Sequence, residues 1–157
     1  MKISILKYGL VTITRSKIHF CLLLIALCLL SLSCSLPKLE TADCADATEA
    51  VREFYSFHYS NDIAMSPDNL KAREKYLSPR LYEELLKNKP ERDYFTDSQI
   101  APKAFKVAEC RAVDENTVNV NVHLFWKPDE RNAVQREAEV EAVKQDGKWL
   151  VDKVSVH

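Results

Sequence analysis

The spacing of apolar residues changes once along this chain, near Ala104, and that change sets the fold class. In residues 45–88, apolar side chains recur every three to four positions, as on one face of a helix. Beyond Ala104 they alternate with polar ones, most clearly in TVNVNVHLFWK at residues 117–127. Similar alternation, bounded by turn residues, occurs at residues 105–113, 133–144 and 149–156. Consecutive strands joined by short turns predict an antiparallel sheet of four strands.

Three helices are predicted ahead of the sheet. The first covers about residues 45–61 and carries a broad aromatic and apolar face. The other two begin at Ser66-Pro67 and Ser78-Pro79, where a serine caps the helix and a proline fills its first position. Pro90 ends the last helix near Asn88. Helices followed by strands predict an α+β domain, with the helices packed on one face of a curved, cone-like sheet.

The first 34 residues are typical of an export signal. Basic residues come first, and an uncharged apolar run over residues 18–32 leads to small residues around Cys34. The sequence before Cys34 is similar to a bacterial lipoprotein box, in which Ser33 is a usual residue and Ser31 replaces the usual leucine. Cleavage and lipidation at Cys34 are therefore predicted. The alternative is an uncleaved transmembrane helix, although the run is shorter than the roughly 20 residues of a comfortable span.

This organisation predicts a signal peptide at residues 1–33, a polar tether at 34–46 and one domain at 47–157. Acyl chains on Cys34 would anchor the protein in a membrane. Ser35 differs from the aspartate that retains such lipoproteins in the inner membrane. We therefore expect an exported, membrane-anchored protein, on the periplasmic face of the outer membrane where the organism has one.

The net charge excludes nucleic acid as a partner, and the glycine content excludes one kind of phosphate-binding site. The basic residues that precede Cys34 leave 18 basic against 23 acidic residues after it, a net charge of −5. An acidic domain is unsuited to nucleic acid, which requires a basic face. The chain has only two glycines, which excludes a glycine-rich phosphate loop. The run Glu137, Glu139 and Glu141 is either a solvated sheet face or a docking surface for a basic partner.

Cys44 and Cys110 are the cysteines that follow Cys34. A disulfide between them would suit an oxidising compartment and would stabilise the domain by about 4 kcal/mol through closure of a long loop. The alternative is two unrelated buried thiols, because cysteine packs as a small apolar side chain.

A pocket between the first helix and the sheet is the candidate binding site. Its predicted lining consists of Phe54, Tyr55, His58, Tyr59, Trp126 and Trp149. The candidate acid–base groups are His58, Tyr55, Tyr59, His123 and Asp93. His123 alternates with the valines of its strand and should face away from them, so the two histidines should not meet.

The residues therefore favour a non-catalytic binding or accessory module for an envelope protein or a small apolar ligand. The alternative is a small-molecule pocket enzyme of the isomerase or dehydratase kind, which needs paired acid–base groups inside the cone. No nucleophile signature, metal-ligand spacing or cofactor motif is present in the sequence, so we predict no catalytic residue, no metal and no cofactor.

Four stretches carry a resemblance to a known family, namely VREFYSFHY, YLSPRLYEELL, DYFTDSQ and DGKWLVDKV. Over residues 48–156 the chain resembles the bacterial lipoprotein family called domain of unknown function 3828, within the nuclear transport factor 2-like superfamily of cone-shaped domains. The family more often has proline after the aspartate of DYF. The resemblance implies the cone fold and an envelope location, and it implies no established reaction.

Overall fold

The structure is a computed structural model that describes residues 41–127 and 131–157. The predicted signal segment, Cys34 and residues 34–40 of the tether lie outside the described residues. Helices precede strands, as predicted. In chain order the elements are α2 (Ala42–Tyr59), α3 (Pro67–Arg73), the 3-10 helix η1 (Glu74–Tyr76), α4 (Pro79–Asn88), β1 (Ala104–Ala112), β2 (Thr117–Trp126), β3 (Val134–Gln145) and β4 (Lys148–Val156).

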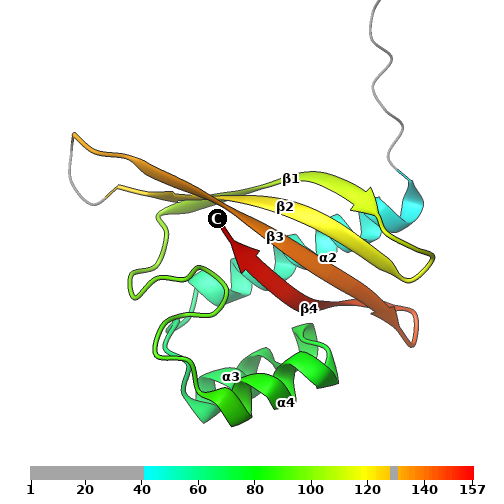
Figure 1. The fold of residues 1–157 in the computed structure, drawn as a ribbon, viewed down its shortest axis with the longest axis horizontal. Helices are drawn as coiled ribbons and strands as arrows, with labels where there is room; N and C mark the ends of the chain where they lie inside the picture. Colours follow the sequence, from blue (N-terminus) through cyan, green and yellow to red (C-terminus); the bar gives the residue numbers. More distant parts are fainter. Residues whose placement is uncertain (1–40, 128–130) are drawn as a thin grey trace, which may run out of the picture. The chain divides into compact units, whose positions relative to one another are not determined.

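The four strands form one antiparallel sheet in the order β1-β2-β3-β4 (Figure 1). Each strand pairs with the next along the chain, and irregularities lie between Val107 and Cys110 in β1 and beside Glu141 in β3. Asp146 and Gly147 join β3 to β4 with φ angles of 50° and 76°. Positive φ at both positions is the requirement of a tight hairpin turn, which explains why an Asp-Gly pair occurs there.

Helix α2 begins earlier than predicted. Thr41 caps it, since the Thr41 hydroxyl accepts a hydrogen bond from the backbone N–H of Cys44 at 3.3 Å. Residues 42–46 therefore lie in the helix rather than in the polar tether. The prediction failed here because it followed apolar spacing, whereas a threonine cap followed by alanine-rich sequence is enough to start the helix.

The two serine-capped helices begin where the sequence predicted. The hydroxyls of Ser66 and Ser78 accept hydrogen bonds from Asn69 and Leu81, each at the third position of its helix. The segment that joins them is fixed to the sheet, because the Ser78 N–H donates to the carbonyl of Val151 at 2.9 Å. Figure 1 shows α3 and α4 together beside β4.

The core lies between α2 and the inner face of the sheet. Val51, Phe54 and Tyr55 of α2 are fully buried. They pack in one cluster with Val118, Val120, Val122, Leu124, Ala138, Val140 and Ala142 of the sheet. Alternation places Val134 on this same face of β3, but its side chain is 42% exposed. Alternation identifies the face of a strand, but it does not show where the covering helix ends.

Candidate functional site

The predicted pocket is filled by the side chains that were expected to line it. Phe54, Tyr55 and His58 are each 0% exposed. The His58 ring contacts the rings of Phe54, Tyr59 and Phe95, with centroids 5.1–5.6 Å apart. Phe95, from the loop before β1, is also fully buried. This part of the described molecule is therefore a packed aromatic core.

A buried polar network runs through that core. The Arg73 Nε–H donates to Nδ1 of His58 at 2.7 Å, and Nε2 of His58 lies 2.9 Å from Oδ2 of Asp93. Because the guanidinium is always a donor, Nδ1 must be an acceptor and the ring proton is on Nε2. His58 is thus a neutral bridge between a cation and a carboxylate.

Asp93 is held by its own loop as well as by His58. Its Oδ2 accepts a hydrogen bond from the Thr96 hydroxyl at 2.6 Å, and its Oδ1 accepts one from the Phe95 N–H at 3.1 Å. Thr96 is fully buried and Asp93 is 3% exposed. Both carboxylate oxygens are therefore engaged, as buried polar groups generally are.

Arg73 completes this network from α3. Its Nη1 and Nη2 groups donate to the carbonyls of Asn69 and Asp62 at 2.6 and 2.7 Å. Burial lowers the pKa of Arg73, while the charges of Asp93 and Asp62 act in the opposite direction. Arg73 is not among the candidate residues predicted from the sequence. The available signal was its position three residues after Leu70 and four before Leu77, both of which are buried.

The two tyrosines are poor proton donors and acceptors for chemistry in this environment. Burial, with a smaller contribution from the charge of Asp93, raises the pKa of Tyr55. Burial also raises the pKa of Tyr59, followed by contributions from Tyr55 and Asp93. The Tyr55 hydroxyl donates to the carbonyl of Phe95 at 3.1 Å. Both groups therefore remain protonated phenols at neutral pH.

The remaining predicted pocket residues lie apart from His58. Trp126 is half-buried near the β2–β3 hairpin, where its indole N–H donates to the carbonyl of Ile100 at 2.8 Å. Trp149 is buried in β4 beneath Lys144, whose ammonium lies 5.5 Å from the indole ring. His123 is on the other face of the sheet from the core valines, as predicted. Its partner in the β2–β3 register is Glu137. The structure therefore brings the two histidines to opposite sides of β2 and its neighbours.

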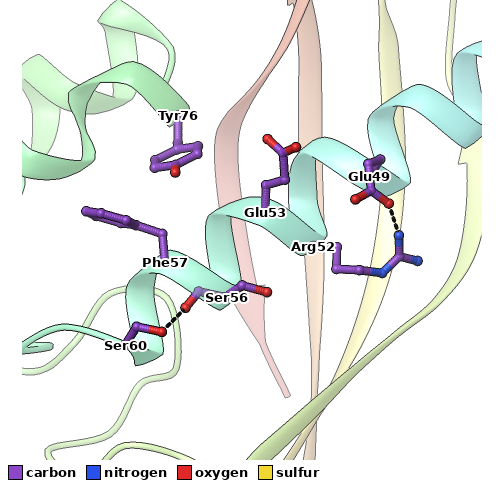
Figure 2. Close-up of a pocket in the computed structure, with 7 residues that line it drawn as sticks. All are labelled: Glu49, Arg52, Glu53, Ser56, Phe57, Ser60 and Tyr76. Atoms are coloured by element: carbon purple, nitrogen blue, oxygen red, sulfur yellow. Dashed lines mark hydrogen bonds and ion pairs between the residues drawn. The ribbon is translucent and has the colours of Figure 1, made fainter.

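An open surface groove lies on the side of α2 that faces away from the core. Figure 2 shows it, with a volume of about 580 Å³, along the solvent face of α2. Its lining residues are Glu49, Arg52, Glu53, Ser56, Phe57, Ser60 and Tyr76. The groove is open, and its aromatic part is the pair Phe57 and Tyr76, with ring centroids 5.2 Å apart. The ammonium of Lys75 lies 5.4 and 4.7 Å from these two rings. The groove does not reach the His58 network.

A disulfide joins Cys44 in the first turn of α2 to Cys110 in β1, with the two Cα atoms 5.7 Å apart. This confirms the first of the two interpretations of these cysteines. The bridge fastens the start of the helix to an edge strand 66 residues later in the chain.

Metal-ligating side chains do not cluster in the described residues: no group of three or more histidine, cysteine, aspartate or glutamate side chains is arranged to hold a metal ion. Within these same residues, no helix is long and apolar enough to cross a bilayer.

Comparisons with known proteins bear on the fold alone. No family model matches the chain, and no curated protein matches it. A protein of unknown function from Bacteroides thetaiotaomicron is similar in structure, with a TM-score of 0.50 and 17% identity over 71% of this chain and 90% of that one. At this identity the likeness shows a shared fold and carries no information about activity.

Two further solved structures have lower scores. An NTF2-like protein involved in plasmid conjugation matches with a TM-score of 0.40 and 18% identity, over 69% of this chain and 49% of that one. A de novo β-sheet design matches with a TM-score of 0.37 and 18% identity, over 74% of this chain and 89% of that one. Neither similarity is high enough to support an inference about this chain. Membership of the domain of unknown function 3828 stays a prediction.

Proposed function

We propose that this chain is an exported lipoprotein whose α+β domain, tethered through Cys34, acts as a binding or accessory module rather than as an enzyme. The observation that carries the proposal is the closed state of the His58 network. Both ring nitrogens of His58 and both carboxylate oxygens of Asp93 are engaged in buried hydrogen bonds. A general acid or base must reach a proton of its substrate, and the polar atoms of His58 and Asp93 are all occupied by buried partners within the protein.

Two observations support the exported location. The sequence before Cys34 is similar to a lipoprotein box, and the Cys44–Cys110 disulfide suits an oxidising compartment. The order of helices followed by a four-stranded antiparallel sheet and the four sequence stretches quoted above support assigning the domain to the nuclear transport factor 2-like superfamily and to the family called domain of unknown function 3828. The periplasmic face of the outer membrane is the proposed location where that membrane exists.

Metabolic labelling with a radioactive fatty acid tests the anchor. We expect label on the wild-type chain and on the Cys28→Ala variant, and none on the Cys34→Ala variant. Cys28 is the matched control because it lies deeper in the same apolar run. Label that persists in Cys34→Ala, or a purified chain that retains residues 1–33, would contradict lipidation and favour the uncleaved helix.

A further inference from the structure

An apolar patch is exposed at the end of the sheet where β2 and β3 meet. We define the hairpin-end patch as Ile100, Trp126 and Val134. Ile100 is 70% exposed and Val134 is 42% exposed. Trp126 lies directly opposite Val134 in the β2–β3 register. The indole N–H of Trp126 donates a hydrogen bond to the carbonyl of Ile100 at 2.8 Å. The three residues are thus one contiguous site, built from two strands and the loop before β1.

The patch is exposed because burial of the inner face of the sheet stops before the end of β3 that the patch occupies. Along the inner face of β3, Val140 and Ala138 are fully buried, whereas Arg136 and Val134 are exposed. In the described residues, the other exposed large apolar side chain is Val113, which is 56% exposed beside the β1–β2 turn at the far end of β2. Exposed apolar side chains that gather at one place mark an interaction site more often than scattered ones do.

Three basic side chains and one carboxylate, that of Asp97, lie beside the patch, although the protein after Cys34 is acidic. Lys103 lies beside the end of β2, since its backbone N–H donates to the Phe125 carbonyl at 2.8 Å, and Lys127 directly follows Trp126. Both lysines are exposed, and neither has a carboxylate partner among the described residues. Arg136 lies 5.6 Å from the Trp126 ring and 3.9 Å from the exposed carboxylate of Asp97. An ion pair this exposed is weak and leaves Arg136 able to meet another anion.

The position of the patch favours a protein partner over the lipid surface. Helix α2 begins at the other end of the sheet, where Asp43 pairs with Lys144 at 2.8 Å and Lys144 donates to the Asn116 carbonyl of the β1–β2 turn. A strand of the length of β2 spans about 33 Å. Six residues lie between Cys34 and Thr41, so these two residues can be at most about 25 Å apart. Thr41, the first described residue, therefore lies at the end of the domain away from the patch.

We propose that the hairpin-end patch docks an acidic segment of a partner protein, with one apolar side chain of that segment seated against Ile100, Trp126 and Val134. The inference deepens the proposed binding role, and its preference for protein over lipid rests on the tether at Cys34. Lys103, Lys127 and Arg136 supply the complementary charge, which contributes mainly to association rate and specificity, while the apolar contacts slow dissociation.

Fluorescence anisotropy on the full chain in mild detergent tests the proposal. The probe is a labelled peptide of glutamates around a single leucine, compared with the same peptide made of glutamines. We expect the glutamate peptide to bind more tightly, with an affinity that falls as salt is added. The Ile100→Ser/Val134→Ser variant should bind it about tenfold more weakly, because two apolar contacts are lost. Lys103→Glu/Lys127→Glu should lose the preference for glutamate.

Val113→Ser is the matched control, since it removes an equally exposed apolar side chain at the opposite end of the sheet. It should bind like the wild type, and thermal melts should show that every variant is folded. Equal binding of both peptides, no binding of either, or an equal loss in Val113→Ser would overturn the proposal. A loss of binding to phosphatidylglycerol vesicles in Ile100→Ser/Val134→Ser that is absent in Val113→Ser, with peptide binding unchanged, would also overturn it in favour of lipid docking, because the acyl anchor is the same in all these chains. The Cys34→Ala chain should bind the peptide normally. Fatty-acid labelling therefore tests the lipid anchor, and peptide binding tests the patch independently of it.

Discussion

Arg73 donates its Nε–H to Nδ1 of His58 at 2.7 Å in a part of the core where the histidine is fully buried and the arginine is 2% exposed. This contact sets the tautomer of His58, and the tautomer sets the direction of the hydrogen bond to Asp93. The sequence on its own presents His58 and Asp93 as candidate acid–base groups. The arginine turns them into a closed bridge between α2, α3 and the loop before β1.

Asp93→Asn should destabilise the domain by about 3 kcal/mol, because it leaves the Arg73 cation buried without its counter-charge. Its amide also places a donor where the His58 Nε2–H and Thr96 hydroxyl need an acceptor. Denaturant unfolding measures the change. Asp97→Asn is the matched control in the same loop, since Asp97 is exposed and pairs only at 3.8 and 3.9 Å. It should change stability by less than about 0.5 kcal/mol. Equal effects of the two substitutions would contradict the structural role of Asp93.

Tyr59→Phe should leave stability at neutral pH unchanged or slightly raised. Among the described residues, the Tyr59 hydroxyl is buried without a hydrogen-bond partner, and removing such a group relieves an unpaired buried donor. Tyr55→Phe removes the hydrogen bond to the Phe95 carbonyl and should cost about 1 kcal/mol. Thermal melts of the two variants distinguish these outcomes. A larger loss in Tyr59→Phe than in Tyr55→Phe would show that the Tyr59 hydroxyl is engaged.

Alkaline pH should unfold the domain. The folded state raises the pKa of both Tyr55 and Tyr59, so above the unfolded value of about 10 the unfolded chain holds fewer protons. Stability is therefore fully present below pH of about 10, and each tyrosine removes about 1.4 kcal/mol per pH unit above it. Unfolding curves measured across that range should show this slope. Tyr59→Phe should reduce the slope by the share of one tyrosine, which is less than half because burial also raises the pKa of Tyr94. A slope that is the same in the variant would indicate that Tyr59 ionises in the folded protein.

Reduction of the Cys44–Cys110 disulfide should lower stability by about 4 kcal/mol in the loop-entropy account. The Cys44→Ser/Cys110→Ser variant should have the stability of the reduced wild type and should not respond to reductant. Denaturant unfolding with and without reductant measures both. Alkylation of Cys44 and Cys110 without prior reduction would show instead that the bridge is not formed.

Ser78→Ala should cost more than Ser66→Ala, although both serines cap a helix that begins with proline. The Ser66 hydroxyl accepts from Asn69, and losing that cap should cost about 1 kcal/mol. The Ser78 hydroxyl accepts from Leu81 and also donates to the buried Asp152 carboxylate of β4. Its removal should therefore cost roughly 2 kcal/mol. Equal costs would show that the link between α4 and β4 contributes little.

Local sequence patterns were sufficient to predict most of the fold. The serine caps at Ser66 and Ser78 act through hydrogen bonds within one turn, and the Asp146-Gly147 turn depends on two φ angles, so both can be read from a few neighbouring residues. Alternation placed Val118 and Val120 on the buried face for the same reason.

The candidate site was less predictable because its properties depend on distant contacts. Arg73 lies on the buried side of its helix by its spacing from Leu70 and Leu77, but a charged residue ordinarily faces water, and its partners His58 and Asp93 are 15 and 20 positions away in the sequence. Trp126 and Val134 continue an inward-facing pattern, but the cover over the sheet stops before reaching them. The sequence cannot show whether a predicted pocket is filled, since Phe95 enters the core from a loop.

The state of the His58 ring tests the central claim most directly. Nitrogen NMR on the isotope-labelled full chain at neutral pH reports which ring nitrogen carries the proton and how fast that proton exchanges with water. We predict a proton on Nε2, an unprotonated Nδ1 and slow exchange, as expected for a ring closed between Arg73 and Asp93. Rapid exchange of that proton, or a proton on Nδ1, would contradict the account and would open His58 to acid–base chemistry.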